Sequence, residues 1–314
     1  MNRPLILIFY LTAIIFSGSC IKSNDANEAI INNRLIKDEF KVSLQGKNIS
    51  NQDLEKLKNF KKLSKLDISQ NPEITKLESL LALRLTDLNI SKTGVSDIVG
   101  IEKCQFIKFL DLSYTKVQNL SALEGMFLYG LSLKGLNIDS LESISKIKSL
   151  YILDCSFTNI NDLSLLTQNI NITDLDISDT KIKNIEPLKF LEGLSKLNLT
   201  NTEIDSIGKL KELIYLESLN LSNTRVNDIT PLKNSINLKT LLISGTKISS
   251  LQSLEKLSKL ETLSLPIGIK DLRPVLKLKK LKKLTLDSSY KEHEGVVELL
   301  SNNNSCEVMW INSK

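Results

Sequence analysis

The sequence predicts an α/β solenoid, an array of short repeats stacked along one axis, and three observations support this prediction. A pattern of apolar residues recurs about every 22 residues between Leu66 and Leu284. Each copy begins with two apolar residues spaced two apart, which is typical of a short strand with both side chains on one face. The apolar residues that follow are spaced three apart, which suits turns or 3₁₀ segments better than a long helix. One repeat cannot bury so many aliphatic groups alone, so the repeats are expected to cover one another's apolar edges.

The repeat is clearest in two adjacent copies that begin at Leu175 and Leu197. In the first copy the residues of the pattern are Leu175, Ile177, Ser178, Thr180, Ile182, Ile185, Leu188, Leu191 and Leu194. The same register recurs at Leu88, Leu110, Leu131, Leu153, Leu219, Leu241 and Leu263. A pattern sustained over this length is a strong signal for a repeat architecture.

These residues resemble the leucine-rich repeat superfamily, in particular the 22-residue class of internalin-like bacterial surface proteins, over about Leu63 to Leu286. The resemblance implies a curved solenoid whose parallel strands line the concave face. The superfamily usually has Asn where this chain keeps only Asn71 and otherwise has Thr93, Thr115, Thr158, Thr180, Thr202, Thr224 and Thr246. We expect these threonines to donate to turn carbonyls as a hydroxyl ladder, with a gap at Leu136.

The N-terminus predicts export. Arg3 precedes an apolar run from Leu5 to Phe16 that is too short for a confident membrane span, so residues 1–19 are interpreted as a signal peptide. The small residues before Cys20 resemble a bacterial lipoprotein signal, although Ser17 replaces the usual leucine. The prediction is therefore a protein lipid-anchored through Cys20 to the bacterial cell envelope, at the outer membrane and with surface exposure left open. Ordinary secretory cleavage near Ser19 is the alternative.

The rest of the chain divides into a tether, two caps and the repeats. Residues 20–27 are predicted to be the lipidated cysteine and a flexible tether, and residues 28–62 an N-terminal cap and irregular first repeat, with a helix over Glu28–Phe40 and a strand at Val42 and Leu44. Residues 63–286 are the repeats. Residues 287–314 are the C-terminal cap, with a strand over Cys306–Ile311 that carries Trp310. The cap helix is predicted over Tyr290–Leu300, with Val296, Val297, Leu299 and Leu300 inside.

Composition and charge exclude several classes of protein. A net charge of +5, spread over 314 residues, is not a nucleic-acid footprint. The lysine-rich run Leu276–Leu284 indicates either a solvated convex face or a contact with an anionic surface. Cys104 and Cys155 are expected to be small core residues, and the single histidine, His293, a solvated one.

Catalytic motifs are not found in the sequence. It contains no Ser/His/Asp set, glycine-rich phosphate loop or Cys/His metal spacing, so we predict a protein that is not an enzyme and needs no cofactor or metal. Aspartates cluster at Asp154, Asp174, Asp176 and Asp179. We interpret them as contact residues or solubilising charge, with acid/base work or Ca²⁺ binding as the less favoured reading.

A candidate binding slot lies on the concave face of the third to fifth clear repeats. Phe109, Tyr114, Ile152 and Phe157 take outward positions, with Gly130 and Gly135 at the matching positions of the repeat between them. Strands about 4.8 Å apart would leave a slot near 10 Å wide above the glycines, rimmed by Tyr129 and Tyr151. With Asp111, Asp154, Asp174 and Asp176 alongside, these residues are the predicted partner-binding set. The alternative, weighed equally, is that the rings only lean on one another beside an irregular repeat.

Two functions remain open at this stage. The first is a surface protein that binds a host or extracellular protein through the concave face. The second is a scaffold that faces the periplasm and binds the cell's own components. An enzyme would need a catalytic domain outside the repeats, for which the caps are too short. Capped ends predict a monomer.

Overall fold

The computed structural model of this chain describes residues 40–302 and 306–312. These residues form two compact units, the first ending at Asn137 and the second beginning at Ile138, and each is described by itself. The predicted signal peptide, Cys20, the tether and residues 28–39 of the predicted cap helix lie outside the described residues.

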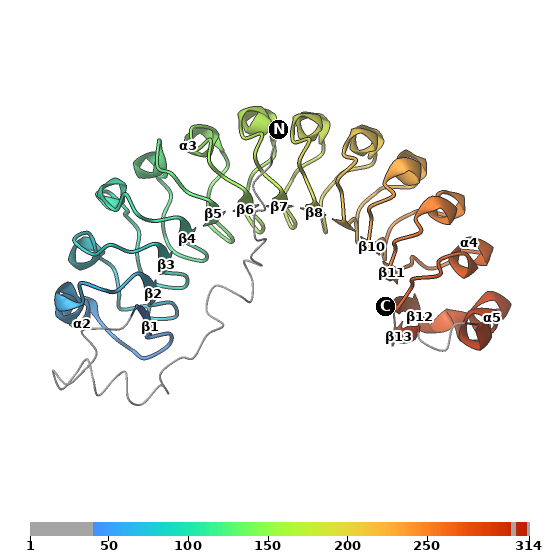
Figure 1. Cartoon of the computed structure of the whole chain (residues 1–314), viewed down its shortest axis with the longest axis horizontal. Coiled ribbons are helices and arrows are strands. Elements are labelled where there is room, and N and C mark those ends of the chain that lie inside the picture. Colours follow the sequence, from blue (N-terminus) through green and yellow to red (C-terminus); the bar gives the residue numbers. More distant parts are fainter. Residues whose placement is uncertain (1–39, 303–305, 313–314) are drawn as a thin grey trace. The chain divides into compact units, whose positions relative to one another are not determined.

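The first unit contains five short parallel strands. They are β1 (Lys41–Ser43), β2 (Lys65–Asp67), β3 (Asp87–Asn89), β4 (Phe109–Asp111) and β5 (Gly130–Ser132), paired in chain order. The return segments are short helix α2 (Asn51–Glu55) and 3₁₀ turns Lys56–Asn59, Glu78–Leu80, Ile101–Lys103 and Ser121–Leu123. Within this unit the strands line the inner side of a curve and the turns the outer side (Figure 1).

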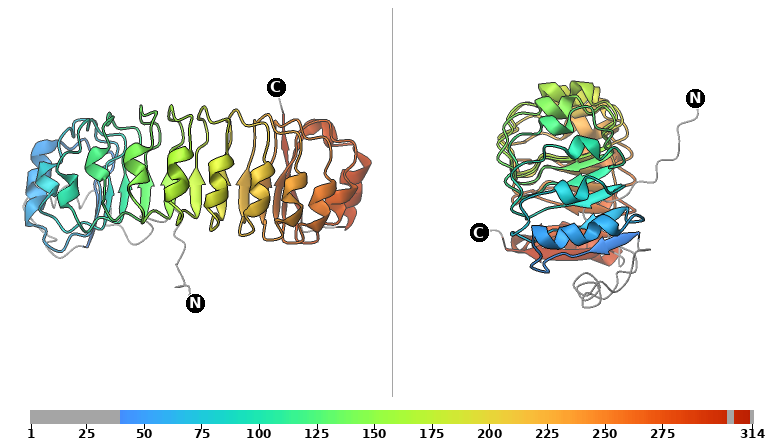
Figure 2. Two further views of the ribbon diagram at one scale, coloured as in Figure 1. Left: turned by 90° about the horizontal axis from the view of Figure 1, so that it is seen from above. Right: turned by 90° about the vertical axis from the view of Figure 1, so that its left-hand side faces the viewer.

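The second unit repeats this plan with eight described strands. They are β6 (Ile152–Asp154), β7 (Asp174–Asp176), β8 (Lys196–Asn198), β9 (Ser218–Asn220), β10 (Thr240–Leu242), β11 (Thr262–Ser264), β12 (Lys283–Asp287) and β13 (Glu307–Ile311), parallel and in chain order. The helices are α3 (Glu142–Ser145), α4 (Arg273–Leu276) and α5 (Glu294–Asn302). The 3₁₀ turns are Ser164–Gln168, Glu186–Phe190, Gly208–Glu212, Thr230–Asn234, Gln252–Lys256 and Ser288–Tyr290. The helical segments of the unit lie side by side, as Figure 2 shows from above.

Register explains why three-residue strands suffice. In the second unit Leu197, Leu219 and Leu241 are direct partners across three neighbouring strands, and all are buried. The backbone ladder continues past each strand, since the N–H of Leu221 donates to the carbonyl of Leu242 at 2.8 Å. Every repeat therefore covers the aliphatic layer of its neighbour and also satisfies its backbone groups. The predicted leucine-rich repeat solenoid fold is confirmed.

Prolines begin three of the return segments. Pro187, Pro231 and Pro274 occupy the first turn of their helical segments, where the missing N–H is not needed for a helical bond. Their fixed backbone angle suits the first turn of a short helical segment, which is 3₁₀ at Pro187 and Pro231 and α-helical at Pro274. The apolar spacing of three therefore produces turns of three to five residues instead of full helices.

The hydroxyl ladder is confirmed. Each ladder threonine donates its hydroxyl to the carbonyl three residues earlier at 2.6 to 2.7 Å, as Thr202 does to Leu199. Asn71 does more, because its amide donates to the carbonyl of Leu44 in the neighbouring repeat at 2.9 Å and accepts from the N–H of Ile49 at 3.1 Å. Threonine thus closes its own turn, whereas Asn71 also joins two repeats. Leu136 occupies the gap and is buried.

The C-terminal cap differs from its prediction. Helix α5 begins at Glu294, four residues later than expected, because the buried Tyr290 hydroxyl accepts from the N–H of Ile269 at 2.6 Å and donates to the carbonyl of Pro266 at 2.9 Å. Those bonds hold Tyr290 in a 3₁₀ turn. Of the four residues expected inside, Val296 and Leu299 are buried while Val297 and Leu300 are exposed.

His293 and the cysteines have structural positions in the fold. The ring of His293 accepts at Nδ1 from the N–H of Gly295 at 3.1 Å, so it caps the start of α5 and is not the merely solvated residue expected. Cys104, Cys155 and Cys306 are free and buried among the described residues, which confirms the core role expected for Cys104 and Cys155. Burial raises the pKa of the Cys155 thiol well above its ordinary value, which favours an unreactive side chain.

Asn71 and the ladder threonines are predicted to contribute different amounts to the stability of the fold. Asn71→Thr should leave the buried N–H of Ile49 without a partner, at about 1–3 kcal/mol. It should also remove one of the two donors to the carbonyl of Leu44, whose other donor is the N–H of Lys47 at 3.3 Å. Thr202→Val leaves only the carbonyl of Leu199 without its hydroxyl donor and should cost about 1 kcal/mol. Urea unfolding measures both, with Thr202→Ser as the control that keeps the hydroxyl. Equal midpoints for Asn71→Thr and the wild type would contradict the inter-repeat role of Asn71.

Candidate partner-binding surface

The candidate residues divide between the two units. Phe109, Asp111, Tyr114, Gly130 and Gly135 belong to the first, and Ile152, Asp154, Phe157, Asp174 and Asp176 belong to the second. Most occupy the first or third position of a strand, which faces away from the core, and we call this side of the strands the strand face. Tyr114, Gly135 and Phe157 instead lie in the turn that follows a strand.

The turn after each of β1 to β10 places one residue in the left-handed backbone conformation, and we call this set the left-handed column. Its φ angles run from +54° to +71°. In the first unit the column contains Gly46, Gln70, Lys92, Tyr114 and Gly135, and in the second it contains Phe157, Asp179, Asn201, Asn223 and Gly245. Gly, Asn and Asp adopt this conformation readily, whereas bulky side chains do so at a cost. Gln70, Lys92, Tyr114 and Phe157 are therefore the members that adopt it at a cost, and Tyr114 and Phe157 are the two aromatic ones.

Tyr114 lies directly over Gly135. A Cβ atom at Gly135 would stand 2.4 Å from Cδ1 of the tyrosine ring, so no larger residue fits there without a shift. On the other side, Nζ of Lys92 lies 5.6 Å from the ring centroid. The space above Gly135 is thus filled by the ring of Tyr114 and is not the open gap expected from strand spacing. Tyr114 is still 43% exposed.

An aromatic cluster lies near the starts of β4 and β5 in the first unit. The Phe109 and Tyr129 rings meet edge to face at 6.3 Å, and Tyr129 meets Phe127 at 5.5 Å. Nζ of Lys108 lies 4.4 Å from the Phe127 ring centroid and 5.5 Å from that of Tyr129. Offset rings with an overlying cation are a stable arrangement that keeps ring area available to a partner. The sequence analysis did not select Phe127 and Lys108 as candidates. An aromatic residue and a lysine shortly before neighbouring strands are the signal that could have indicated them.

In the second unit the candidates are one exposed ring and a row of acids. Phe157 has φ +57° and is 49% exposed, while Ile152 in β6 is partly exposed. Asp174 pairs with Lys196 of the next strand at 3.1 Å. Asn198 donates its amide to Asp176 at 2.9 Å.

The acids at the third strand position have a structural role that the sequence did not reveal. Oδ1 of Asp111, Asp154 and Asp176 each accepts from the N–H two residues later at 2.9 Å, closing the end of its strand. Asn89, Asn198 and Asn220 make the same bond in their own repeats, at 2.9, 3.1 and 3.0 Å. Such Asx turns are local backbone devices. The acids are therefore strand-end residues first, and in Asp176 the second oxygen is also engaged, because it accepts from the amide of Asn198.

Burial also changes their electrostatics. Removal from water raises the pKa of the Asp111 carboxyl, and the negative charge of Asp67 adds to this, while the bonds from Ser113 oppose it. Burial likewise raises the pKa of Asp174, although the Lys196 ammonium opposes the rise. An Asn would close the same turn as Asp111 without this desolvation cost.

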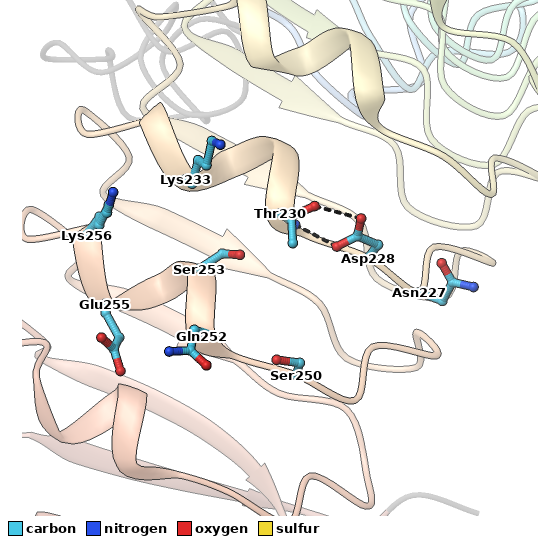
Figure 3. A pocket seen from close by; sticks show the side chains of 9 residues that line it. All are labelled: Asn227, Asp228, Thr230, Lys233, Ser250, Gln252, Ser253, Glu255 and Lys256. Carbon is cyan, nitrogen blue, oxygen red and sulfur yellow. Dashed lines mark hydrogen bonds between the residues drawn. The ribbon is translucent and has the colours of Figure 1, made fainter.

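The described part of this surface does not have the geometry of a metal centre. Within residues 40–302 and 306–312, no three His, Cys, Asp or Glu side chains come together as a metal site. A cavity of about 290 Å³ lies on the convex side of the second unit, between the 3₁₀ turns Thr230–Asn234 and Gln252–Lys256 (Figure 3). Its Asp228 carboxylate is occupied by the Thr230 N–H at 2.8 Å and hydroxyl at 2.7 Å. We therefore assign that cavity no chemistry.

Membrane contact is not provided by a spanning helix in the described part of the chain. No helix there is both long and apolar enough to cross a bilayer.

Several solved structures have a fold similar to that of this chain. An internalin (InlF) of Listeria monocytogenes superposes with a TM-score of 0.76 at 20% identity, covering 92% of this chain and 88% of that one. A leucine-rich repeat protein of Leptospira interrogans superposes with a TM-score of 0.64 at 21% identity, covering 81% and 74%. At these identities the likeness defines the class of protein by its fold, a leucine-rich repeat solenoid.

A third similar structure is a plant receptor. The leucine-rich repeat ectodomain of the membrane receptor kinase GASSHO1/SCHENGEN3 from Arabidopsis thaliana, solved in complex with CASPARIAN STRIP INTEGRITY FACTOR 2, has a TM-score of 0.56 at 17% identity, covering 82% of this chain and 37% of that one. No protein-family model matches the sequence, and no curated protein matches it.

The raised pKa of Asp111 predicts a stabilising substitution. A carboxyl whose folded pKa exceeds its unfolded value favours folding at low pH, and this contribution is lost as the pH rises through the folded pKa. Asp111→Asn keeps the turn acceptor and removes the loss, so it should unfold at higher temperature than the wild type at pH 7. The difference should shrink as the pH falls toward about 4, the pKa of an unfolded aspartate.

The reverse change is the matched control. Asn89→Asp, at the same strand position and next to both Asp67 and Asp111, should lower the unfolding temperature at pH 7. Thermal scans across this pH range measure both variants. A wild type more stable than Asp111→Asn at pH 7 would contradict the desolvation argument.

Proposed function

We propose that this chain is a non-enzymatic, lipid-anchored bacterial surface protein that binds a protein partner through the concave strand face. The observation that carries the proposal is the pair of aromatic residues in the left-handed column. Tyr114 and Phe157 are the aromatic members of a column that otherwise contains Gly, Asn, Asp, Gln and Lys, and each remains more than two-fifths exposed.

The cost of this arrangement supports binding. A bulky residue in the left-handed conformation costs on the order of 1–3 kcal/mol. Folding returns little of it, because much of each ring remains in water. Aromatic side chains that are half exposed are typical anchors for protein partners, where their burial stabilises the complex. An Asn could accept the same turn bond as Asp111. The acid is therefore not needed for the turn, which supports a contact with a partner.

Two further points support a binding role. The leucine-rich repeat ectodomain of GASSHO1/SCHENGEN3 was solved in complex with CASPARIAN STRIP INTEGRITY FACTOR 2, and the plant peptide hormone receptor RGFR1 was solved in complex with RGF2. In addition, the described strand face of each unit carries mostly small polar side chains, and it is interrupted by Phe109 in the first unit and by Ile152 in the second. A small polar surface around large anchors is the expected composition of an interface centre and its surroundings.

We further propose that Cys20 carries the lipid and holds the folded body at the cell envelope. The support is the sequence of Arg3, the apolar run Leu5–Phe16 and the small residues before Cys20. Outer-membrane attachment with the repeats facing outward is the favoured arrangement. A scaffold that faces the periplasm is the alternative.

The column aromatics give a direct test. Tyr114→Asn with Phe157→Asn places in both turns a residue that Asn201 and Asn223 show to be compatible. Immobilised protein would be offered purified extracellular matrix proteins and, separately, a solubilised extract of the cell's own envelope. Capture should fall by more than about 30-fold, the loss of one strong anchor. Thermal stability should stay unchanged or rise.

Phe190→Asn is the control for that test, because Phe190 is similarly exposed but lies at the end of a 3₁₀ turn on the convex side. It should capture the partner as the wild type does. Full capture by the double variant would remove the strand-face proposal.

The anchor is tested by Cys20→Ala in intact cells. The wild type should partition with membranes and be cut by protease added outside, whereas the variant should leave the membrane fraction. A wild type that is anchored but protected from protease would favour the periplasm-facing scaffold. Unchanged partitioning of Cys20→Ala would show that the lipid assignment is wrong.

A further inference from the structure

One edge of the second unit combines exposed apolar and basic residues in neighbouring repeats. The turn that leads into each of β9 to β12 has the same backbone bond, in which Ile214, Ile236, Ser258 and Lys279 each donate an N–H to the carbonyl two residues earlier. The strands that follow are paired in register, at Leu219, Leu241, Leu263 and Leu284. The four turns are therefore equivalent positions in consecutive repeats.

The side chains on these turns form a defined patch. We call Ile214, Tyr215, Ile236, Lys259, Lys279 and Lys280 the edge-turn patch, and all six are exposed. The exposed fractions of Ile214 and Ile236 are 53% and 54%, which is high for isoleucine. Adjacent repeats lie about 4.8 Å apart, so the four turns span roughly 15 Å. The two isoleucine repeats thus lie beside the two lysine repeats.

Local bonds hold the patch in line. The amide of Asn237 donates to the carbonyl of Ile214 at 2.9 Å, and Nζ of Lys259 donates to the other end of the same amide at 2.7 Å. Two acids close to these turns, Glu217 and Glu261, are bonded to Lys239 at 2.8 Å and to Lys282 at 2.7 Å. A third acid, Glu212, is exposed two residues before Ile214. Because Lys259, Lys279 and Lys280 outnumber this acid, the patch keeps a positive excess.

We propose that the edge-turn patch docks on an anionic lipid bilayer, with the apolar side chains at the level of the acyl boundary and the lysines at the lipid phosphates. Amphipathic surfaces that bind membranes without crossing them combine these two residue types. A bilayer offers both partners continuously, whereas a protein would need acids placed to match Lys259, Lys279 and Lys280 beside an apolar patch. The strand face of the unit remains open, because the patch lies on the turns that precede the strands.

This proposal goes beyond protein binding by the strand face and does not depend on it. It accounts for the lysine run from Leu276 to Leu284, which begins at the end of α4 and ends in β12. The proposed lipid at Cys20 would raise the local concentration of bilayer at the patch, but the patch should bind without it.

The test is cosedimentation with lipid vesicles. The chain from residue 20 to 314, with Cys20→Ser to exclude the lipid, would be mixed with vesicles of phosphatidylglycerol and phosphatidylethanolamine, or of phosphatidylcholine alone. Binding is expected to the anionic vesicles and should weaken with salt. Lys259→Glu with Lys279→Glu and Lys280→Glu should reduce it on the order of 100-fold, at about 5-fold for each lysine. Ile214→Ser with Ile236→Ser should also weaken it.

Matched variants on the opposite turns are the controls. Lys181→Glu with Lys247→Glu and Lys270→Glu makes the same charge change at exposed lysines that lie after the strands, and Ile267→Ser removes an exposed isoleucine there. These controls should bind vesicles nearly as the wild type does. No binding to anionic vesicles, or equal losses in both lysine triples, would overturn the proposal.

The outcome is distinguishable from a failure of the strand-face proposal. Tyr114→Asn with Phe157→Asn should still sediment with vesicles if the patch is a membrane surface. If the edge-turn variants instead lose capture of a protein while vesicle binding is unaffected, the occupant is a protein and the membrane proposal is wrong.

Discussion

Stacking of equivalent repeats is the constraint on which the rest of this structure depends. Strands of three residues cannot be stable alone, and each is held by backbone bonds to its neighbours and by an aliphatic layer that the next repeat covers. Because a shift by one residue would turn Leu219 and its partners out of the core, the register of each pair is fixed. Equivalent residues of successive repeats therefore lie side by side. A residue that differs in type from its equivalents in the other repeats is then easy to recognise.

The residues of the proposed binding surface depart from the repeat pattern. Tyr114 and Phe157 accept an unfavourable backbone conformation, and Gly135 gives up its side chain where the Tyr114 ring lies. Asp111 remains ionisable in a place where Asn89 makes the same turn bond without a charge. Each choice costs stability that a neighbouring repeat avoids. Such costs are expected where a surface is kept for a partner.

The sequence predicted the fold because the repeat is a local pattern of apolar spacing, and it predicted the threonine ladder because every hydroxyl bonds within its own turn. It failed where a distant contact decides. The start of α5 depends on bonds of Tyr290 to Ile269 and Pro266, and no helical pattern contains that information. The role of Gly135 was also hidden, because ring direction at Tyr114 is set by three-dimensional packing.

Photocrosslinking in intact cells tests the central claim, that a partner contacts the strand face at the left-handed column, most directly. A photoreactive phenylalanine analogue would replace Phe157 in one strain and Phe190 in another, two positions with the same exposed fraction of 49%. We predict a discrete adduct of higher mass after illumination at position 157 and none at position 190. Adducts from position 190 alone would place the partner on the convex side and contradict the account.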